Sequence, residues 1–147
     1  MSTTTTDFTL RPASFTNDRE ALRAVRETVF VAEQHAPPDT EWDSMDPVGD
    51  HMLAINATGA PIGTARLTPD GRFSRLAVLK SWRGKGVGEA LLLAMIDKAR
   101  AQGWTQLTLY AQVATEGFYK RHGFVVEGAP FDDVGILHQS MRLKLRD

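Results

Sequence analysis

The residues with the clearest chemical meaning form the stretch Arg83-Gly84-Lys85-Gly86-Val87-Gly88, between a strand-like run and a predicted helix. The first turn of a helix has backbone N–H groups without partners and a partial positive charge. Glycines let the backbone curve around an anion without Cβ clashes, and Arg83 and Lys85 add full charges. The stretch therefore predicts a phosphate site, with charge-assisted hydrogen bonds of about 1.5–3 kcal/mol each. A glycine-rich turn that only starts a helix is the alternative.

The loop lacks the features of two common phosphate-binding motifs. A P-loop needs Ser or Thr after Gly-Lys to bind magnesium, but Gly86 follows Lys85. A dinucleotide-binding fingerprint needs a third glycine where Glu89 or Leu91 stands. Such fingerprints also follow the first strand of a parallel sheet, whereas this loop follows a predicted antiparallel meander. The loop therefore matches neither motif.

The composition excludes other chemistries and partners. The chain has no cysteine, which removes disulfides, zinc–thiolate sites and a Cys nucleophile. With 17 Lys and Arg against 18 Asp and Glu, the net charge of −1 argues against a nucleic-acid-binding protein. No apolar run approaches the ~20 residues of a membrane span, and the N-terminus lacks the features of a signal peptide. We expect a cytoplasmic protein with no nucleic-acid or membrane partner.

The elements that position the loop can be predicted from periodicity and turn signals. At 147 residues the chain has the length of one domain, 1–147, of which 1–7 is predicted to be a flexible tail. The expected elements are strand 8–11, which stops at Pro12, helix 19–31, strands 51–55, 62–67 and 72–78, a helix from the loop to Gly103, strand 107–110, helix 114–122, and strands 124–126 and 140–145. The pattern predicts an α/β (α+β) domain with a central mixed, mostly antiparallel sheet flanked by helices.

An acidic segment from Glu33 to Asp50 separates the first helix from the meander. It contains no Lys or Arg, and its acids are Glu33, Asp39, Glu41, Asp43, Asp46 and Asp50. Two interpretations stay open: a solvated loop, or a wall that attracts a cationic acceptor.

Three groups of motifs carry a family resemblance. Arg83-x-x-Gly86-x-Gly88, placed after Leu76-Ala77-Val78, resembles the acetyl-CoA pyrophosphate motif of the GNAT acetyltransferase superfamily. Gln112, followed by Phe118-Tyr119, resembles the family's segment after its fifth strand, although Asn is more usual at the first position. Further pieces resemble the ElaA-like branch: Val29-Phe30-Val31-x-Glu33-Gln34, Gly63-x-x-Arg66-Leu67 and Gly135-Ile136-x-His138-x-x-Met141. The resemblance implies the acyl-CoA N-acyltransferase fold.

The resemblance also implies a donor site for acetyl-CoA as co-substrate. Backbone groups of Leu76, Ala77 and Val78 would pair with the pantetheine amides, as an added strand pairs with a sheet edge. The residues expected to bind the pyrophosphate are Arg83, Gly84, Lys85, Gly86, Val87 and Gly88. Gln112 and Tyr119 complete the expected donor site. Lys120 and Arg121 could approach the nucleotide phosphates, although a solvated helix face is the simpler interpretation.

Without cysteine, direct attack of an amine on the thioester in a ternary complex is the simplest chemistry. The resemblance places Tyr119 beside the thioester sulfur, where a phenol of ordinary pKa about 10 can protonate a thiolate of ordinary pKa about 8.5. Packing is the other role open to Tyr119. The base that receives the amine proton is less defined: we name Glu33 and His138, while His51, Glu127 and water stay open.

We predict an N-acetyltransferase that acts on a primary amine of a small molecule or peptide, as a monomer or homodimer. A non-catalytic acyl-CoA-binding regulatory or interaction module is the alternative. His35, His51 and His138 could bind a metal together with nearby acids, but no ligand spacing requires it. We therefore expect no metal.

Overall fold

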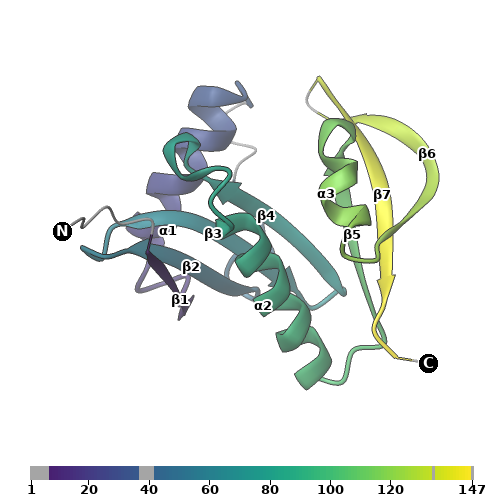
Figure 1. Cartoon of the computed structure of the whole chain (residues 1–147), viewed down its shortest axis with the longest axis horizontal. Helices are drawn as coiled ribbons and strands as arrows, with labels where there is room; N and C mark the ends of the chain where they lie inside the picture. Colours follow the sequence, from purple (N-terminus) through teal and green to yellow (C-terminus); the bar gives the residue numbers. More distant parts are fainter. Residues whose placement is uncertain (1–6, 37–41, 134, 147) are drawn as a thin grey trace.

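The computed structural model describes residues 7–36, 42–133 and 135–146. They contain a seven-stranded sheet with the strand order β1-β2-β3-β4-β5-β7-β6 (Figure 1). The strands are β1 (Phe8–Ala13), β2 (Asp50–Asn56), β3 (Pro61–Thr68), β4 (Arg72–Val78), β5 (Gln106–Gln112), β6 (Val125–Asp133) and β7 (Ile136–Lys144). The helices are α1 (Arg19–Arg26), η1 (Glu27–Glu33), η3 (Lys80–Trp82), α2 (Val87–Ala101), η4 (Val113–Thr115) and α3 (Glu116–Lys120). The predicted mixed, mostly antiparallel sheet flanked by helices is confirmed.

The sheet is divided between β4 and β5. Strands β2 to β4 form the predicted antiparallel meander, and β1 adds to it as an antiparallel edge strand. On the other side of the sheet, β7 is antiparallel to both β5 and β6. The β4–β5 pairing is parallel and holds at a single position, Arg72 with Thr108, where the Thr108 N–H donates to the Gly71 carbonyl at 2.9 Å. Beyond it the two strands diverge toward their carboxyl ends (Figure 1).

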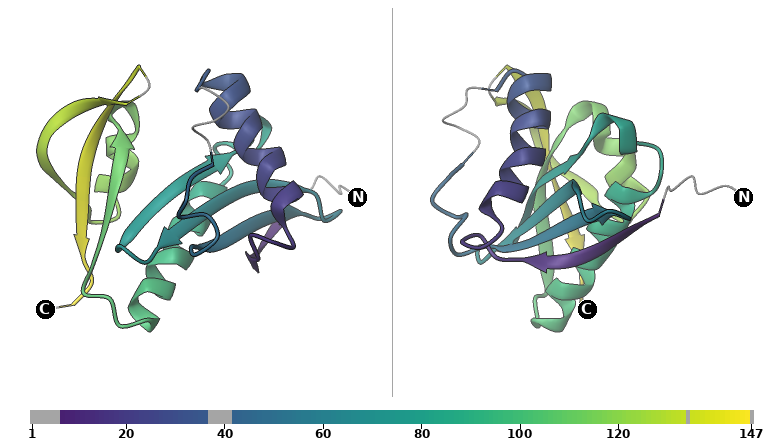
Figure 2. Two further views of the ribbon diagram at one scale, coloured as in Figure 1. Left: turned by 180° about the vertical axis from the view of Figure 1, so that it is seen from behind. Right: turned by 90° about the vertical axis from the view of Figure 1, so that its left-hand side faces the viewer.

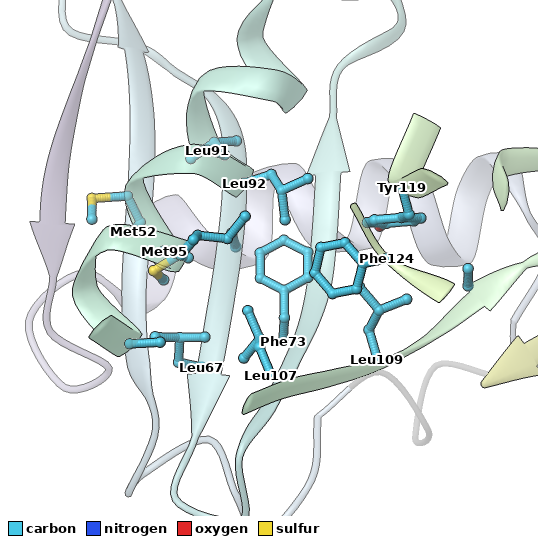
Figure 3. Close-up of a cluster of buried hydrophobic side chains, with 14 of the residues drawn as sticks. Met52, Leu67, Phe73, Leu91, Leu92, Met95, Leu107, Leu109, Tyr119 and Phe124 are labelled. Atoms are coloured by element: carbon cyan, nitrogen blue, oxygen red, sulfur yellow. The ribbon is translucent and has the colours of Figure 1, made fainter. Parts of the chain in front are cut away.

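The two helical layers lie on opposite faces of the meander (Figure 2). On one face, α2 buries apolar residues spaced three and four apart: Val87, Leu91, Leu92, Met95, Ile96 and Ala99. Phe73 of β4 packs in this core, beside Tyr119 and Phe124 (Figure 3). Gly63 of β3 permits the close approach of α2, because an added Cβ there would lie 3.0 Å from Val87. On the other face, Val25 and Val29 pack on Ala77.

Several sequence-based boundaries are wrong, among them the start of the last strand, which begins at Ile136 and not at 140. The first strand does not stop at Pro12 but continues to Ala13. Because β1 is an edge strand that pairs only with β2, the missing N–H of the proline costs no hydrogen bond to a second strand. The helix predicted over 19–31 changes at Glu27 into a π-helix that runs to Glu33. Strand β6 extends to Asp133, well beyond the predicted 126, by a register shift between Glu127 and Phe131.

The described part of the acidic segment contributes to a buried ion network behind β4. Asp46 receives two hydrogen bonds from Arg26, at 2.9 and 3.2 Å, and one from Arg66 at 3.0 Å. Asp43 pairs with Arg66 at 2.7 Å and with Arg75 at 3.0 Å. These two carboxylates therefore have arginine partners within the fold, in contrast to the proposed acceptor wall.

Burial alone would raise the pKa of Asp46, but the hydrogen bonds from Arg26 and from the Asp43 backbone outweigh it and hold the pKa below its ordinary value. Asp39 and Glu41, from the same acidic segment, lie outside the described residues. Met1 to Thr6, in the predicted tail, also lie outside them. The helices of the described chain are too short or too polar to cross a bilayer.

Candidate active site

The divergence of β4 and β5 opens a cleft of about 790 Å³ between their carboxyl ends. The structure brings eight of the predicted site residues to its walls: Leu76, Ala77, Val78, Arg83, Gly88, Gln112, Tyr119 and His138. Because β4 pairs with β5 only at Arg72, the part of its edge along Leu76 to Val78 has no strand on the cleft side. That edge can accept an extended ligand as an additional strand.

The predicted phosphate loop lies beside this edge and has the backbone that its glycines permit. Gly84 and Gly86 have φ angles of 75° and 85°, in the left-handed region, and Gly86 is the N-cap of α2. An added Cβ at either position would meet no atom within 4 Å, so conformation rather than crowding requires glycine. Val87 buries its side chain in the core and leaves only its backbone to the loop. The N–H groups of the first turn of α2 have no carbonyl partner within the helix and can bind an anion.

The two charged side chains of the loop already have partners within the protein. Arg83 binds Glu33 through two hydrogen bonds, at 2.6 and 2.8 Å, and its Nε donates to the Val78 carbonyl at 3.0 Å. Lys85 donates to the Ser81 carbonyl at 3.1 Å. The charge of Arg83 is therefore balanced by Glu33, and the backbone N–H groups are the main anion donors of this loop.

The end of η1 bridges both walls of the cleft through two consecutive residues. Glu33 holds Arg83, which follows β4, while Gln34 accepts a hydrogen bond from Gln112, at the end of β5, at 3.0 Å. Gln112, the predicted donor-site residue, therefore connects β5 to η1. Gln34 was not predicted as a site residue, although it belongs to the motif that carries the family resemblance.

Tyr119 lies in α3 at the boundary between the core and the cleft. Its ring makes edge contacts with Phe73, Phe118 and Phe124, at centroid distances of 6.4, 5.0 and 5.8 Å. Only 8% of the residue is exposed, and burial raises the pKa of its hydroxyl above the ordinary value. The phenol is therefore neutral at physiological pH and can donate a hydrogen bond into the cleft.

His138 lies on β7, in the row of the sheet that contains Gln112. Its Nδ1 lies 2.8 Å from the Ile136 carbonyl, which can only accept a hydrogen bond. The hydrogen therefore resides on Nδ1, and Nε2 has a free lone pair for a proton. Phe131 stacks on the imidazole at a centroid distance of 5.9 Å and fixes its plane.

The other candidate bases are in less suitable surroundings. The Arg83 guanidinium lowers the pKa of Glu33, which makes that carboxylate a weaker base. His51 is buried against Asp46, and Glu127 pairs with Arg142 at 3.2 Å. Among the described residues no three His, Asp or Glu side chains gather as a metal site. On α3, Lys120 pairs with Glu116 at 3.4 Å, which fits the solvated-face interpretation.

Comparison with known proteins identifies the family in which a glycine-rich loop at a helix N-terminus lies beside this divided sheet. The model of the acetyltransferase (GNAT) domain matches residues 16–145. This chain belongs to the GNAT acetyltransferase family. The GNAT domain is 36% identical to an uncharacterized N-acetyltransferase, YjcF of Bacillus subtilis, over 80% of this chain and 86% of that protein. Membership makes the protein an acetyltransferase that uses an acyl-CoA donor and an amine acceptor.

Solved structures show the same GNAT fold. An acyl-CoA N-acyltransferase from Pseudomonas aeruginosa superposes with a TM-score of 0.83 at 25% identity, over 93% of this chain and 99% of that one. Escherichia coli ElaA superposes with a TM-score of 0.81 at 22% identity, over 94% of this chain and all of that one, 100%. The resemblance to GNAT enzymes, with ElaA among the structural neighbours, is confirmed.

The sequence did not predict most of the residues on the cleft wall away from the phosphate loop. The additional side chains on that wall include Arg72, Ser74, Arg75, Tyr110 and Asp133. They stand on β4, β5 and β6 without a motif. Alternation along β4 could have placed Arg72 and Ser74 on one face, but not Arg75, which directly follows Ser74. Arg75 has a φ of 55°, at the register shift of β4 against β3, which no residue pattern indicated.

Proposed function

We propose that the protein transfers an acetyl group from acetyl-CoA to a primary amine by direct attack within a ternary complex. The observation that carries this proposal is the divergence of β4 and β5 after one residue pair, which opens a cleft with Tyr119 and His138 both on its walls. One cleft can thus hold a donor along β4 and an acceptor next to a base, with no covalent enzyme intermediate.

The residues present fit an acetyl-CoA donor. The open edge of β4 at Leu76 to Val78 has the shape needed to pair with the pantetheine amides, and the first turn of α2 offers N–H groups for the pyrophosphate. Acetyl-CoA supplies an activated thioester at the end of this edge.

Two side chains handle the protons of the reaction. His138 accepts a proton from the attacking nitrogen through Nε2, as the nitrogen forms its bond to the carbonyl carbon. Tyr119 donates to the sulfur as the carbon–sulfur bond breaks and the electron pair moves to sulfur. The products are an amide and a free thiol. The proton that His138 took up then returns through water to the Tyr119 oxygen, so atoms and charge balance and both side chains recover their starting states.

The raised pKa of Tyr119 has a defined consequence for this step. A phenol above its ordinary pKa gives up its proton less readily than sequence-based reasoning assumed. The same apolar surroundings also raise the pKa of a thiol formed beside it, because burial disfavours either anion. The hydroxyl therefore stabilises the departing thiolate by a short-lived shared proton rather than as a strong acid.

A thiol-release assay with purified protein, acetyl-CoA and a panel of primary amines tests the proposal. We expect acceptor-dependent release of CoA, with the acetylated amine detected by mass spectrometry. Binding of acetyl-CoA without release for any amine in the panel would instead identify an acyl-CoA-binding module.

A further inference from the structure

The end of the cleft opposite the phosphate loop contains an arginine in an unusual position. Arg72, the first residue of β4, lines the cleft where β4 and β5 meet. Its guanidinium lies 4.2 Å from the centre of the Tyr110 ring and donates to the Tyr110 hydroxyl at 3.0 Å. The ring and hydroxyl thus hold the guanidinium in one place on the wall.

The four arginines of the cleft differ in how closely carboxylates approach them. Arg83, Arg66 and Arg75 have ion-pair distances of 2.6, 2.7 and 3.0 Å. For Arg72 the corresponding distance, to Asp70, is 3.9 Å, and both side chains of this pair are more than a third exposed. Such a contact contributes little. Among the described residues, Arg72 is therefore the cleft arginine whose charge is least compensated by an ion pair.

A row of aromatic side chains joins Arg72 to the proposed base. Tyr110 makes an edge contact with Phe131 at 5.2 Å, and Phe131 stacks on His138 at 5.9 Å. Tyr110 is 48% exposed, so it offers ring surface to a ligand. Tyr110 and Gln112, the strand partner of His138, are two residues apart on β5, which is about 7 Å along the strand. A molecule that lies along this row of rings could contact Arg72 at one end and His138 at the other.

From this arrangement we infer that the acceptor is a small amine that also has an anionic group, a carboxylate or a phosphate, which Arg72 binds. The inference rests on the proposed function, because it specifies the acceptor of that reaction. The planar guanidinium offers a pair of parallel N–H donors that match a carboxylate or phosphate. His138 receives the amine at the other end of the aromatic row, so the amine and the anionic group of the acceptor are recognised at separate places.

The test compares acceptors that differ only in their charge. β-Alanine is set against β-alaninamide, and phosphoethanolamine against ethanolamine, with kcat/KM expressed per neutral amine. The variants are Arg72→Gln, Arg72→Glu and, as a matched control, Arg142→Gln. Arg142 is an exposed arginine in the same row of the sheet, since Thr108 pairs with both residues, and it lies on β7 beside Glu127.

We expect the wild type to prefer at least one anionic acceptor over its neutral analogue by about 10- to 100-fold, the range of a charge-assisted hydrogen bond. Arg72→Gln should abolish this preference and Arg72→Glu should reverse it, while Arg142→Gln keeps it. Preference for β-alanine alone identifies a carboxylate, and preference for phosphoethanolamine alone identifies a phosphate.

Two results would overturn the inference while the proposed function stands: equal rates for charged and neutral acceptors, or a preference that Arg72→Gln leaves intact. The absence of turnover with every amine, in protein that binds acetyl-CoA, contradicts the proposed function itself, and the acceptor assignment falls with it. Acetyl-CoA binding in each variant confirms that the fold is retained.

Discussion

At the proposed donor end of the cleft the groups open to a ligand belong to the backbone, in the loop 84–88 and along the open edge of β4, whereas the proposed acceptor end is made of side chains on β4, β5 and β7. The donor end needs positive φ angles at Gly84 and Gly86 and an unpartnered helix terminus. The acceptor end needs a particular guanidinium, ring and imidazole, those of Arg72, Tyr110 and His138.

This difference explains why the proposed donor end can be recognised from a sequence and the proposed acceptor end cannot. Backbone recognition constrains residue types at fixed spacing, because only glycine adopts a positive φ freely, so it leaves a motif. Recognition by side chains from three strands leaves no fixed spacing of residues in the sequence, because these residues meet only after the sheet has formed. Substitutions can therefore test each end separately.

The largest effect is expected for Tyr119→Phe, because Tyr119 is proposed to act at the reacting atoms, where the donor and acceptor ends of the cleft meet. The variant keeps the ring contacts with Phe73 and Phe124 but loses the hydroxyl, so donor binding should be unchanged. The chemical step should slow by about 10²–10⁴-fold, the range of general acid catalysis. Single-turnover rates measure this. The deficit should shrink with a donor whose leaving thiol is more acidic, and equal rates with acetyl-CoA would make Tyr119 a packing residue.

His138→Gln is expected to act from the acceptor side, by roughly 10²-fold. The loss of rate in this variant should depend on the basicity of the amine and not on the acidity of the leaving thiol, because His138 is proposed to accept the amine proton. Single-turnover rates with hydroxylamine, which is less basic than an alkylamine and requires less help from a base, should differ less between wild type and variant. A deficit that follows the leaving thiol would place His138 on the donor side.

A matched pair of glycine variants isolates the donor end. Gly86 and Gly59 have φ angles of 85° and 87°, and an added Cβ meets no atom within 4 Å at either site. Alanine should therefore destabilise both positions similarly, by about 1–2 kcal/mol. Only Gly86→Ala should weaken acetyl-CoA binding, by about tenfold in calorimetry, equivalent to one charge-assisted hydrogen bond. Equal affinities in the two variants would remove the loop from the donor site.

The ion network behind β4 predicts a modest pH dependence of stability. The His51 Nε2–H donates to the Asp46 carbonyl at 2.9 Å, and burial lowers the pKa of His51 below its ordinary value of about 6.5. The unfolded chain therefore takes up a proton as pH falls through 6.5, while the folded chain resists protonation. Stability present above pH 6.5 is lost below it, by at most about 1.4 kcal/mol per pH unit.

Urea unfolding of wild type and His51→Gln between about pH 5.5 and 7.5 measures this slope. The carboxylates whose pKa values are lowered in the fold, those of Asp18, Glu33, Asp43 and Asp46, lose their contribution mainly below about pH 5, so this range separates them from His51. The slope should be smaller in the variant. An identical slope in both proteins would assign it to other groups.

Removal of metal ions is expected to have no effect. Dialysis against EDTA should leave the acetyl-transfer rate unchanged, because the proposed reaction places its protons on His138 and Tyr119. Inactivation by EDTA, with recovery on addition of zinc or magnesium, would restore the hypothesis of a histidine metal site.

The sequence predicted most of the sheet because alternation and turns are local. The meander of β2, β3 and β4 and the helix α2 occur where periodicity and Gly103 placed them, and their boundaries differ by few residues. Strand β6 exceeded its prediction because Gly128 and Pro130, which normally interrupt strands, are accommodated by a register shift against β7. Pro12 was misjudged because edge position, which allows proline, depends on the strand order of the whole sheet.

The site residues that belong to sequence motifs could be predicted, and those outside such motifs could not. The phosphate loop, Gln112, Tyr119 and His138 were proposed from residue patterns and resemblance, and their roles stay predictions. The pairing of Arg83 with Glu33 could not be foreseen, since fifty positions separate the two residues in sequence. The same holds for Arg72 and Tyr110, which meet only because β4 and β5 share one parallel pair.

The single contact between β4 and β5 has a consequence for how such a protein can diversify. In the proposed function one strand edge and one helix terminus serve the donor, so we expect those positions to tolerate little change in backbone. The opposite side chains project from strands that are already held by β3 and β7. Exchanging a residue such as Arg72 or Tyr110 changes no loop length. We therefore expect single substitutions there to alter the choice of acceptor while use of the donor persists.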